Sequence, residues 1–110
     1  MTKYERALQL WSVLALAATN KQILTYDIIS KLVGVPRPAL GQSLELIQQI
    51  CQKKNIPPLT ALVVSEETGR PGHGFTASTD VPLAQMQVFK FDWLTFTAPN
   101  IESITTTLES

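Results

Sequence analysis

The stretch TYDIISKLVGVPRPAL, residues 25 to 40, predicts the start of two helices joined by a short turn. Thr25 offers a side-chain oxygen that can cap the first helix, and residues 26 to 33 form two amphipathic turns. Asp27 lies in the first turn, where a negative charge complements the helix dipole. Gly34 ends this helix, because glycine accepts the left-handed backbone that often follows a helix.

A second helix is expected from Pro38, which suits a first helical turn, to about Lys53 or Lys54. Its expected buried face consists of Leu40, Leu44, Ile47 and Cys51. Its expected outer face consists of Gln42, Glu45, Gln48, Gln49 and Gln52. Two helices joined through a glycine-containing turn make a helix-turn-helix, which either binds DNA through its second helix or serves only as a packing unit.

Patterns on either side of this unit predict its packing partners. Apolar residues at helical spacing indicate a helix over residues 4 to 18, with Trp11 as a core residue. The other expected elements are a strand at 59 to 65, a glycine-rich turn or wing at 66 to 75, a second strand near 73 to 76, a helix near 82 to 88 capped by Thr79 or Asp80, and an aromatic strand at 89 to 93.

These elements together predict one α+β domain over residues 1 to 110, of winged helix-turn-helix type, with three main helices and a small sheet. The tail from about residue 98 is rich in serine and threonine, and we expect it to be loosely ordered.

Composition limits the possible functions. The 110 residues carry a formal net charge of zero, so any DNA contact requires a local basic patch. A single cysteine, Cys51, and a single histidine, His73, give no disulfide and no zinc ligand set, and we expect neither a metal nor another cofactor. The apolar stretch at 7 to 18 is too short to cross a bilayer, and a reducing cytoplasm is the expected location.

Five short groups of residues occur in a characteristic order along about half of the chain. They are residues 25 to 29 with Gly34, Pro36 and Arg37 with residues 39 to 41, residues 56 to 58 before Val63 and Val64, Thr68 and Gly69, and Gly74 and Phe75. In this order the chain resembles the C-terminal winged-helix domain of O6-alkylguanine-DNA alkyltransferases. Residues 57 to 60 and 91 to 93 also resemble small uncharacterised bacterial or mobile-element proteins of no known activity.

The resemblance implies a winged-helix fold and a DNA surface, but not the repair chemistry. When the paired valines are aligned on Val63 and Val64, Thr60 stands where the family has its reactive cysteine, and no activating base follows it. Pro38 stands at the position of the arginine that the family inserts into DNA, and Arg37 lies one residue earlier. Alkyl transfer is therefore not expected.

Two classes of function follow from these observations. The first is a non-enzymatic winged-helix protein that binds double-stranded DNA through Tyr26, Arg37, Gln42, Arg70 and His73. All of these residues except Gln42 also have a structural interpretation. Arg37 would be a solvated arginine, Tyr26 a tyrosine packed at a helix start, and Arg70 and His73 incidental charges in a turn. The second is a protein-interaction module or homodimer that uses the glutamine face or the aromatic cluster at 89 to 96. The sequence contains no catalytic dyad and no phosphate loop, so an enzyme is not expected.

Overall fold

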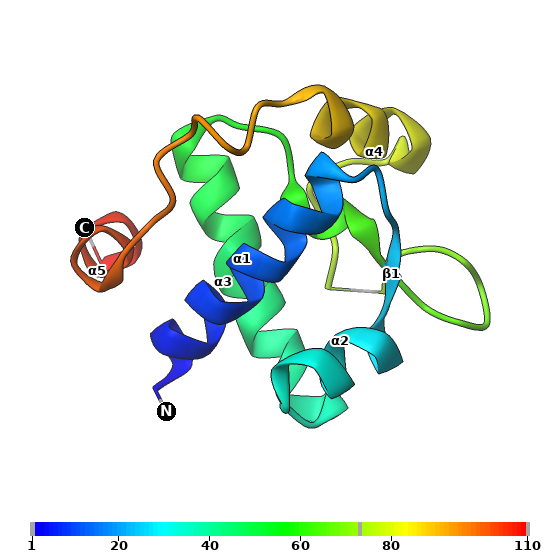
Figure 1. Ribbon diagram of the computed structural model, residues 1–110, viewed down its shortest axis with the longest axis horizontal. Helices are drawn as coiled ribbons and strands as arrows, with labels where there is room; N and C mark the ends of the chain where they lie inside the picture. Colours follow the sequence, from blue (N-terminus) through cyan, green and yellow to red (C-terminus); the bar gives the residue numbers. More distant parts are fainter. Residues whose placement is uncertain (1, 73, 110) are drawn as a thin grey trace.

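The computed structural model describes residues 2 to 72 and 74 to 109, and His73 lies outside these described residues. The described chain is mostly helical, with a small two-stranded sheet, as expected of a small α+β fold (Figure 1). Its elements are α1 (Lys3–Thr19), β1 (Leu24–Thr25), α2 (Tyr26–Val33), α3 (Arg37–Lys54), the 3₁₀-helix η1 (Leu59–Leu62), β2 (Val63–Val64), α4 (Val81–Lys90) and α5 (Ile101–Glu109). None of the helices within the described ranges is both long and apolar enough to cross a membrane.

The two helices predicted around the opening stretch are confirmed. The Thr25 side chain accepts a hydrogen bond from the Ile28 backbone N–H at 3.2 Å, and α2 begins at the next residue. Gly34 follows α2 with φ of 68°, a left-handed conformation in which its N–H donates to the Ser30 carbonyl. The α3 helix then begins at Arg37 and ends at Lys54.

The strand predicted at 59 to 65 is wrong over most of its length. Residues 59 to 62 form the 3₁₀-helix η1, in which the Ala61 N–H donates to the Pro58 carbonyl, and only Val63 and Val64 form a strand. All four η1 residues are buried. A short apolar run that is buried on every side has no face-specific period, so its pattern cannot distinguish a strand from a helical turn. The second strand predicted near 73 to 76 does not form in residues 74 to 76.

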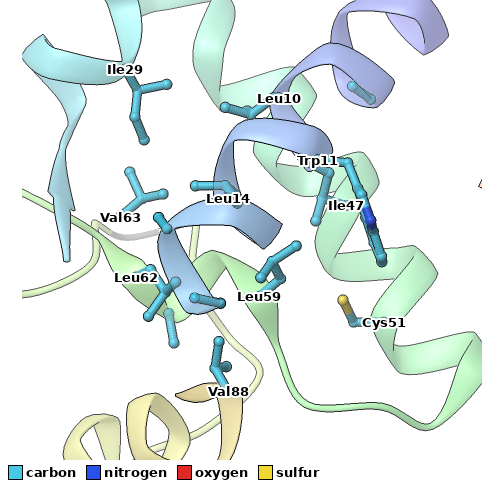
Figure 2. Packing of buried hydrophobic residues seen from close by; sticks show 14 of the residues in the cluster. Leu10, Trp11, Leu14, Ile29, Ile47, Cys51, Leu59, Leu62, Val63 and Val88 are labelled. Carbon is cyan, nitrogen blue, oxygen red and sulfur yellow. The ribbon is translucent and has the colours of Figure 1, made fainter. Parts of the chain in front are cut away.

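The sheet consists of β1 and β2 in parallel, with Leu24 opposite Val63 and Thr25 opposite Val64. The core lies between α1, α3 and η1, and side chains from α2 and α4 complete it (Figure 2). Its fully buried side chains include Leu10, Leu14, Ile29, Ile47, Leu59, Leu62, Val63 and Val88.

The aromatic residues near the C-terminal part belong to this core and form no strand. The α4 helix continues through Phe89 to Lys90, and turns follow it. Trp93 is buried, donates its Nε1–H to the Val88 carbonyl at 2.7 Å, and packs edge-on against Trp11 with ring centroids 5.8 Å apart. The predicted core position of Trp11 is therefore confirmed. The aromatic residues alternate in sequence because their rings pack together around the end of α4. A two-residue period alone does not distinguish this arrangement from a strand.

The tail that the sequence predicted to be loosely ordered contains a helix in this structure. Residues 101 to 109 form α5, which packs on α1 and α3 (Figure 1), and Ile104 is completely buried. Asn100 and Ser103 cap this helix by exchanging hydrogen bonds of 2.8 Å, each from a backbone N–H to the other side chain. Lys53 Nζ donates to the Thr107 carbonyl at 2.8 Å. Serine and threonine in this tail therefore act as cap and surface residues of a docked helix.

Cys51 lies on the inner side of α3, with its sulfur among core side chains (Figure 2). Burial raises the pKa of this thiol to about 11, although a hydrogen bond with the Leu59 backbone opposes part of the rise. At neutral pH the thiol is protonated, and it is buried, as the sequence predicted.

Candidate functional site

Arg37 begins α3 and takes part in two interactions there. Its Nη2 lies 3.3 Å from Glu66 Oε2, and its guanidinium group lies over the Tyr26 ring at 5.9 Å from the centroid. Glu66 Oε1 also accepts a hydrogen bond of 2.8 Å from the Asp27 backbone N–H, at the start of α2. One carboxylate therefore connects the first turns of both helices, and Arg37 is paired rather than simply solvated.

The environment of Glu66 favours its charged form. Hydrogen bonds from its own backbone N–H and from that of Asp27 lower the pKa of the carboxyl group, and the positive charge of Arg37 adds to this effect. The pair is partly exposed, with 52% of the Arg37 side chain and 36% of the Glu66 side chain accessible to solvent. Water and salt therefore weaken the attraction between the two charges, and a competing anion can reach Arg37.

Tyr26 holds the loop that follows β2. Its hydroxyl oxygen accepts a hydrogen bond of 2.8 Å from the Gly72 backbone N–H. A Cβ atom on Gly72 would lie 2.7 Å from the same oxygen, so a side chain at this position would displace the tyrosine. Neither interpretation of Tyr26, as a DNA contact or as a tyrosine packed at a helix start, included this contact.

Arg70 lies in the loop at residues 65 to 72, which projects beside β1 (Figure 1). The loop is closed by hydrogen bonds from the Ser65 N–H to the Arg70 carbonyl and from the Gly69 N–H to the Ser65 carbonyl, at 2.8 and 2.9 Å. The Arg70 residue is exposed. Because Glu66 belongs to the same loop, the Arg37–Glu66 pair places this loop against the start of α3.

Gln42 does not share a face with Arg37. It is exposed on α3, but five residues separate it from Arg37, which corresponds to about 140° around a helix of 3.6 residues per turn. The structure therefore brings Tyr26, Arg37 and the loop of Arg70 together and leaves Gln42 apart. The predicted role of His73 concerns a residue that is not described.

Gln48 was expected on the polar face of α3, and that expectation is wrong. Only 6% of the residue is exposed. Its Nε2 donates to the Gly74 carbonyl at 3.1 Å, and its Oε1 accepts from the Thr76 and Ala77 N–H groups at 2.9 and 3.2 Å. The Gln48 side chain thus makes the backbone hydrogen bonds that a neighbouring strand would otherwise make with residues 74 to 77.

A signal for this burial was present in the sequence. Gln48 lies four residues after Leu44 and three before Cys51, which are positions on the same side of a helix as those two apolar residues. Gln48 was nevertheless predicted to lie on the outer face because its side chain is polar. A buried amide is stable only when its donors and acceptors are satisfied, and the segment at 74 to 77 satisfies them here.

A cavity of about 130 Å³ lies between α3 and residues 71, 72, 74 and 75. Its lining residues are Tyr26, Gly41, Leu44, Glu45, Gln48, Thr60, Pro71, Gly72, Gly74 and Phe75. Thr60 is 5% exposed, and among the described residues its hydroxyl has no hydrogen-bond partner. The burial of this hydroxyl could not be foreseen from the sequence alone.

Across residues 2 to 72 and 74 to 109, no group of histidine, cysteine, aspartate and glutamate side chains could hold a metal ion. Thr60 is a weak nucleophile, because a hydroxyl needs an adjacent base for activation, and no hydrogen bond to such a base is found within the described chain. A scan of protein-family models and searches of curated proteins and of solved structures found no match for this chain.

Proposed function

We propose that this chain is a non-enzymatic DNA-binding protein of winged-helix type. The observation that supports the proposal is the pair α2 and α3 with the exposed Arg37 at the first position of α3, beside a projecting loop that carries Arg70. In helix-turn-helix proteins the N-terminal residues of the second helix approach base edges, and flanking loops contact phosphates. The resemblance to the alkyltransferase domain supports the same surface.

The charges around this surface make the proposed binding weak and dependent on salt. Lys31 pairs with Asp27 at 3.1 Å, and Arg37 pairs with Glu66, so two cations near α2 and α3 already have anionic partners. A DNA phosphate would replace Glu66 as the partner of Arg37. Since the formal net charge of the chain is zero, general attraction to DNA adds little, and the affinity depends on a few local contacts.

Loss of either proposed phosphate contact should weaken binding to a labelled random-sequence duplex, measured by fluorescence anisotropy at low and at moderate salt. Arg37→Ala and Arg70→Ala should each reduce affinity at low salt and lower the slope of log affinity against log salt by about one unit. Lys90→Ala is the matched control, because it removes one positive charge from the exposed end of α4. Absence of binding by the native protein at low salt, or equal losses in all three variants, would contradict the proposal.

Removal of the competing carboxylate should have the opposite effect. Glu66→Gln keeps an oxygen for the Asp27 N–H but frees Arg37, so DNA affinity at low salt should rise by up to about fivefold, the range of an exposed ion pair. Glu67→Gln makes the same change in net charge on the same loop, where the described structure shows no ion pair for it. If both variants gain equally, overall charge rather than release of Arg37 explains the effect.

A second candidate function is self-association through α2. Ile28 and Leu32 lie one turn apart on this helix and are 44% and 61% exposed, although both are large and apolar. The aromatic cluster at 89 to 96 offers less, because its rings pack on one another and on Trp11. Light scattering measures the mass in solution of native protein and of an Ile28→Ser, Leu32→Ser double variant. Self-association through an apolar interface should persist at high salt, whereas DNA binding should not, so the two candidates can be separated.

A further inference from the structure

We propose that the outer face of α4 pairs with the same face of a second copy of this chain, in a symmetric dimer whose two α4 helices run antiparallel. This face, called the α4 face below, consists of Asp80, Leu83, Met86, Gln87 and Lys90. It is separate from the DNA surface, because α4 and α2 lie on opposite sides of the molecule in Figure 1. The inference does not depend on the proposed DNA binding.

The α4 face is apolar at its centre and points away from the core. Ala84 and Val88 are buried and define the inner side of α4. Leu83 and Met86 are three residues apart, so they are neighbours on the other side, where they are 47% and 51% exposed. Two adjacent apolar side chains of this size gain free energy when a partner removes them from water.

Unlike charges lie at the two ends of the α4 face. Asp80 precedes Leu83 by three residues, and Lys90 follows Met86 by four. Asp80 and Lys90 are both exposed, and neither forms an ion pair within the described part of the chain. The ten residues between them correspond to about 15 Å along a helix, so the two charges cannot pair with each other.

This order of residues is complementary to itself in one direction only. When two copies of α4 run antiparallel, Leu83 of each copy lies opposite Met86 of the other. Asp80 of each copy then lies opposite Lys90 of the other, as a two-fold axis requires. A parallel pair would instead bring the two aspartates together and the two lysines together, and like charges repel. The α4 face therefore specifies both the partner, a second copy, and its direction.

The exposed apolar face of α2 lacks this complementarity. Ile28 and Leu32 lie on it, but the only charged residues of α2, Asp27 and Lys31, already pair with each other at 3.1 Å. A second copy would therefore find no unpaired charge on α2. The α4 face offers a second copy both apolar contact and charge pairing, whereas α2 offers apolar contact alone.

The size of the α4 face predicts a weak dimer. The α4 helix has ten residues, so it is about 15 Å long. A pair of such helices buries much less than the roughly 1,600 Å² of a standard stable interface. We expect a dissociation constant of roughly 0.1 to 1 mM, which is the range of weak association.

Sedimentation equilibrium of native protein at low salt, from about 10 µM to about 2 mM, tests whether the dimer forms. The average mass should rise toward that of two chains. Leu83→Ser, Met86→Ser should raise the dissociation constant at least about tenfold, because less apolar area leaves water on pairing. Ile28→Ser, Leu32→Ser makes the equivalent change on α2 and should dimerise as native protein does. The proposal is overturned if native protein stays monomeric, if the α4 variant dimerises normally, or if the α2 variant loses the dimer.

A double-mutant cycle on the two charges tests the direction of the pair. Lys90→Glu should raise the dissociation constant about three- to thirtyfold at low salt, because it places two carboxylates opposite each other at both ends of the interface. Asp80→Asn removes the repelling charge and keeps an oxygen that can cap the Leu83 N–H. In this background, Lys90→Glu should change the dissociation constant by less than about threefold.

Coupling between these two positions must arise between chains, because about 15 Å of helix separates them within one chain. Lys3→Glu is the control: it makes the same change in charge at an exposed residue of α1 and should alter dimerisation less than about twofold. Additive effects of the Asp80 and Lys90 substitutions, or an equal loss in Lys3→Glu, would overturn the antiparallel pairing. This result stands even if Leu83→Ser, Met86→Ser does not fold.

Failure of this proposal is distinguishable from failure of the proposed function. The sedimentation measurements contain no DNA. At protein concentrations up to roughly 10 µM a dimer this weak is mostly dissociated, so Lys90→Ala remains a control for DNA binding there. A protein that dimerises but binds no duplex supports the α4 face alone, and a monomer that binds duplex supports the DNA surface alone.

Discussion

Gln48→Ala should lower the free energy of unfolding by roughly 2 to 4 kcal/mol, the largest effect that we expect from a single polar substitution in this chain. The variant removes three hydrogen bonds and leaves one carbonyl and two N–H groups of residues 74 to 77 without their partner. A lost net bond costs about 1 kcal/mol, and a buried group that stays unsatisfied costs more. Urea denaturation followed by circular dichroism measures the change.

Gln52→Ala is the matched control for this prediction. Gln52 is exposed on the same helix, so its replacement should change the free energy of unfolding by no more than about 0.5 kcal/mol. The amides of Thr76 and Ala77 should also exchange with solvent faster in Gln48→Ala than in native protein. Equal stability of the two variants would show that water satisfies residues 74 to 77 as well as Gln48 does.

Ile104→Ala should destabilise the protein by about 2 to 5 kcal/mol, the usual range for truncating a buried isoleucine. Ile104 is completely buried where α5 packs on α1 and α3. The substitution removes apolar surface from the core and leaves a cavity that neighbouring side chains fill only in part. Thermal and urea denaturation measure the loss.

Ile101→Ala provides the comparison, because Ile101 is 45% exposed on the same helix. This substitution should lower the free energy of unfolding by less than half as much as Ile104→Ala, because folding removes less of the apolar surface of Ile101 from water. If both substitutions cost under about 0.5 kcal/mol, then α5 contributes nothing to stability, as the sequence-based prediction of a loosely ordered tail would require.

Local signals allowed the sequence to predict α2 and α3. A cap at Thr25, a left-handed glycine at Gly34 and a proline in a first turn act within a few residues, so their meaning does not depend on the rest of the fold. The strands predicted at 59 to 62 and 89 to 93 did not form, for the opposite reason. In both segments the conformation depends on packing against distant elements, here α1, α3 and α4.

The candidate site, too, could be predicted only where signals within a short segment define it. The positions of Tyr26 and Arg37 at helix starts were predictable, but the partners Glu66 and Gly72 come from a loop whose approach only the tertiary structure shows. The cavity is lined by residues from four separate segments of the chain. No pattern within one segment indicates such an enclosure.

The small parallel sheet has a consequence for how the chain folds. Leu24 meets Val63 only after α2, α3 and η1 have folded back between them, because parallel strands need a long crossover. Two residues per strand cannot supply the energy to close so large a loop by themselves. We therefore expect the helices to assemble first and the strand pair to join the chain on either side of the helix-turn-helix as a late step of folding.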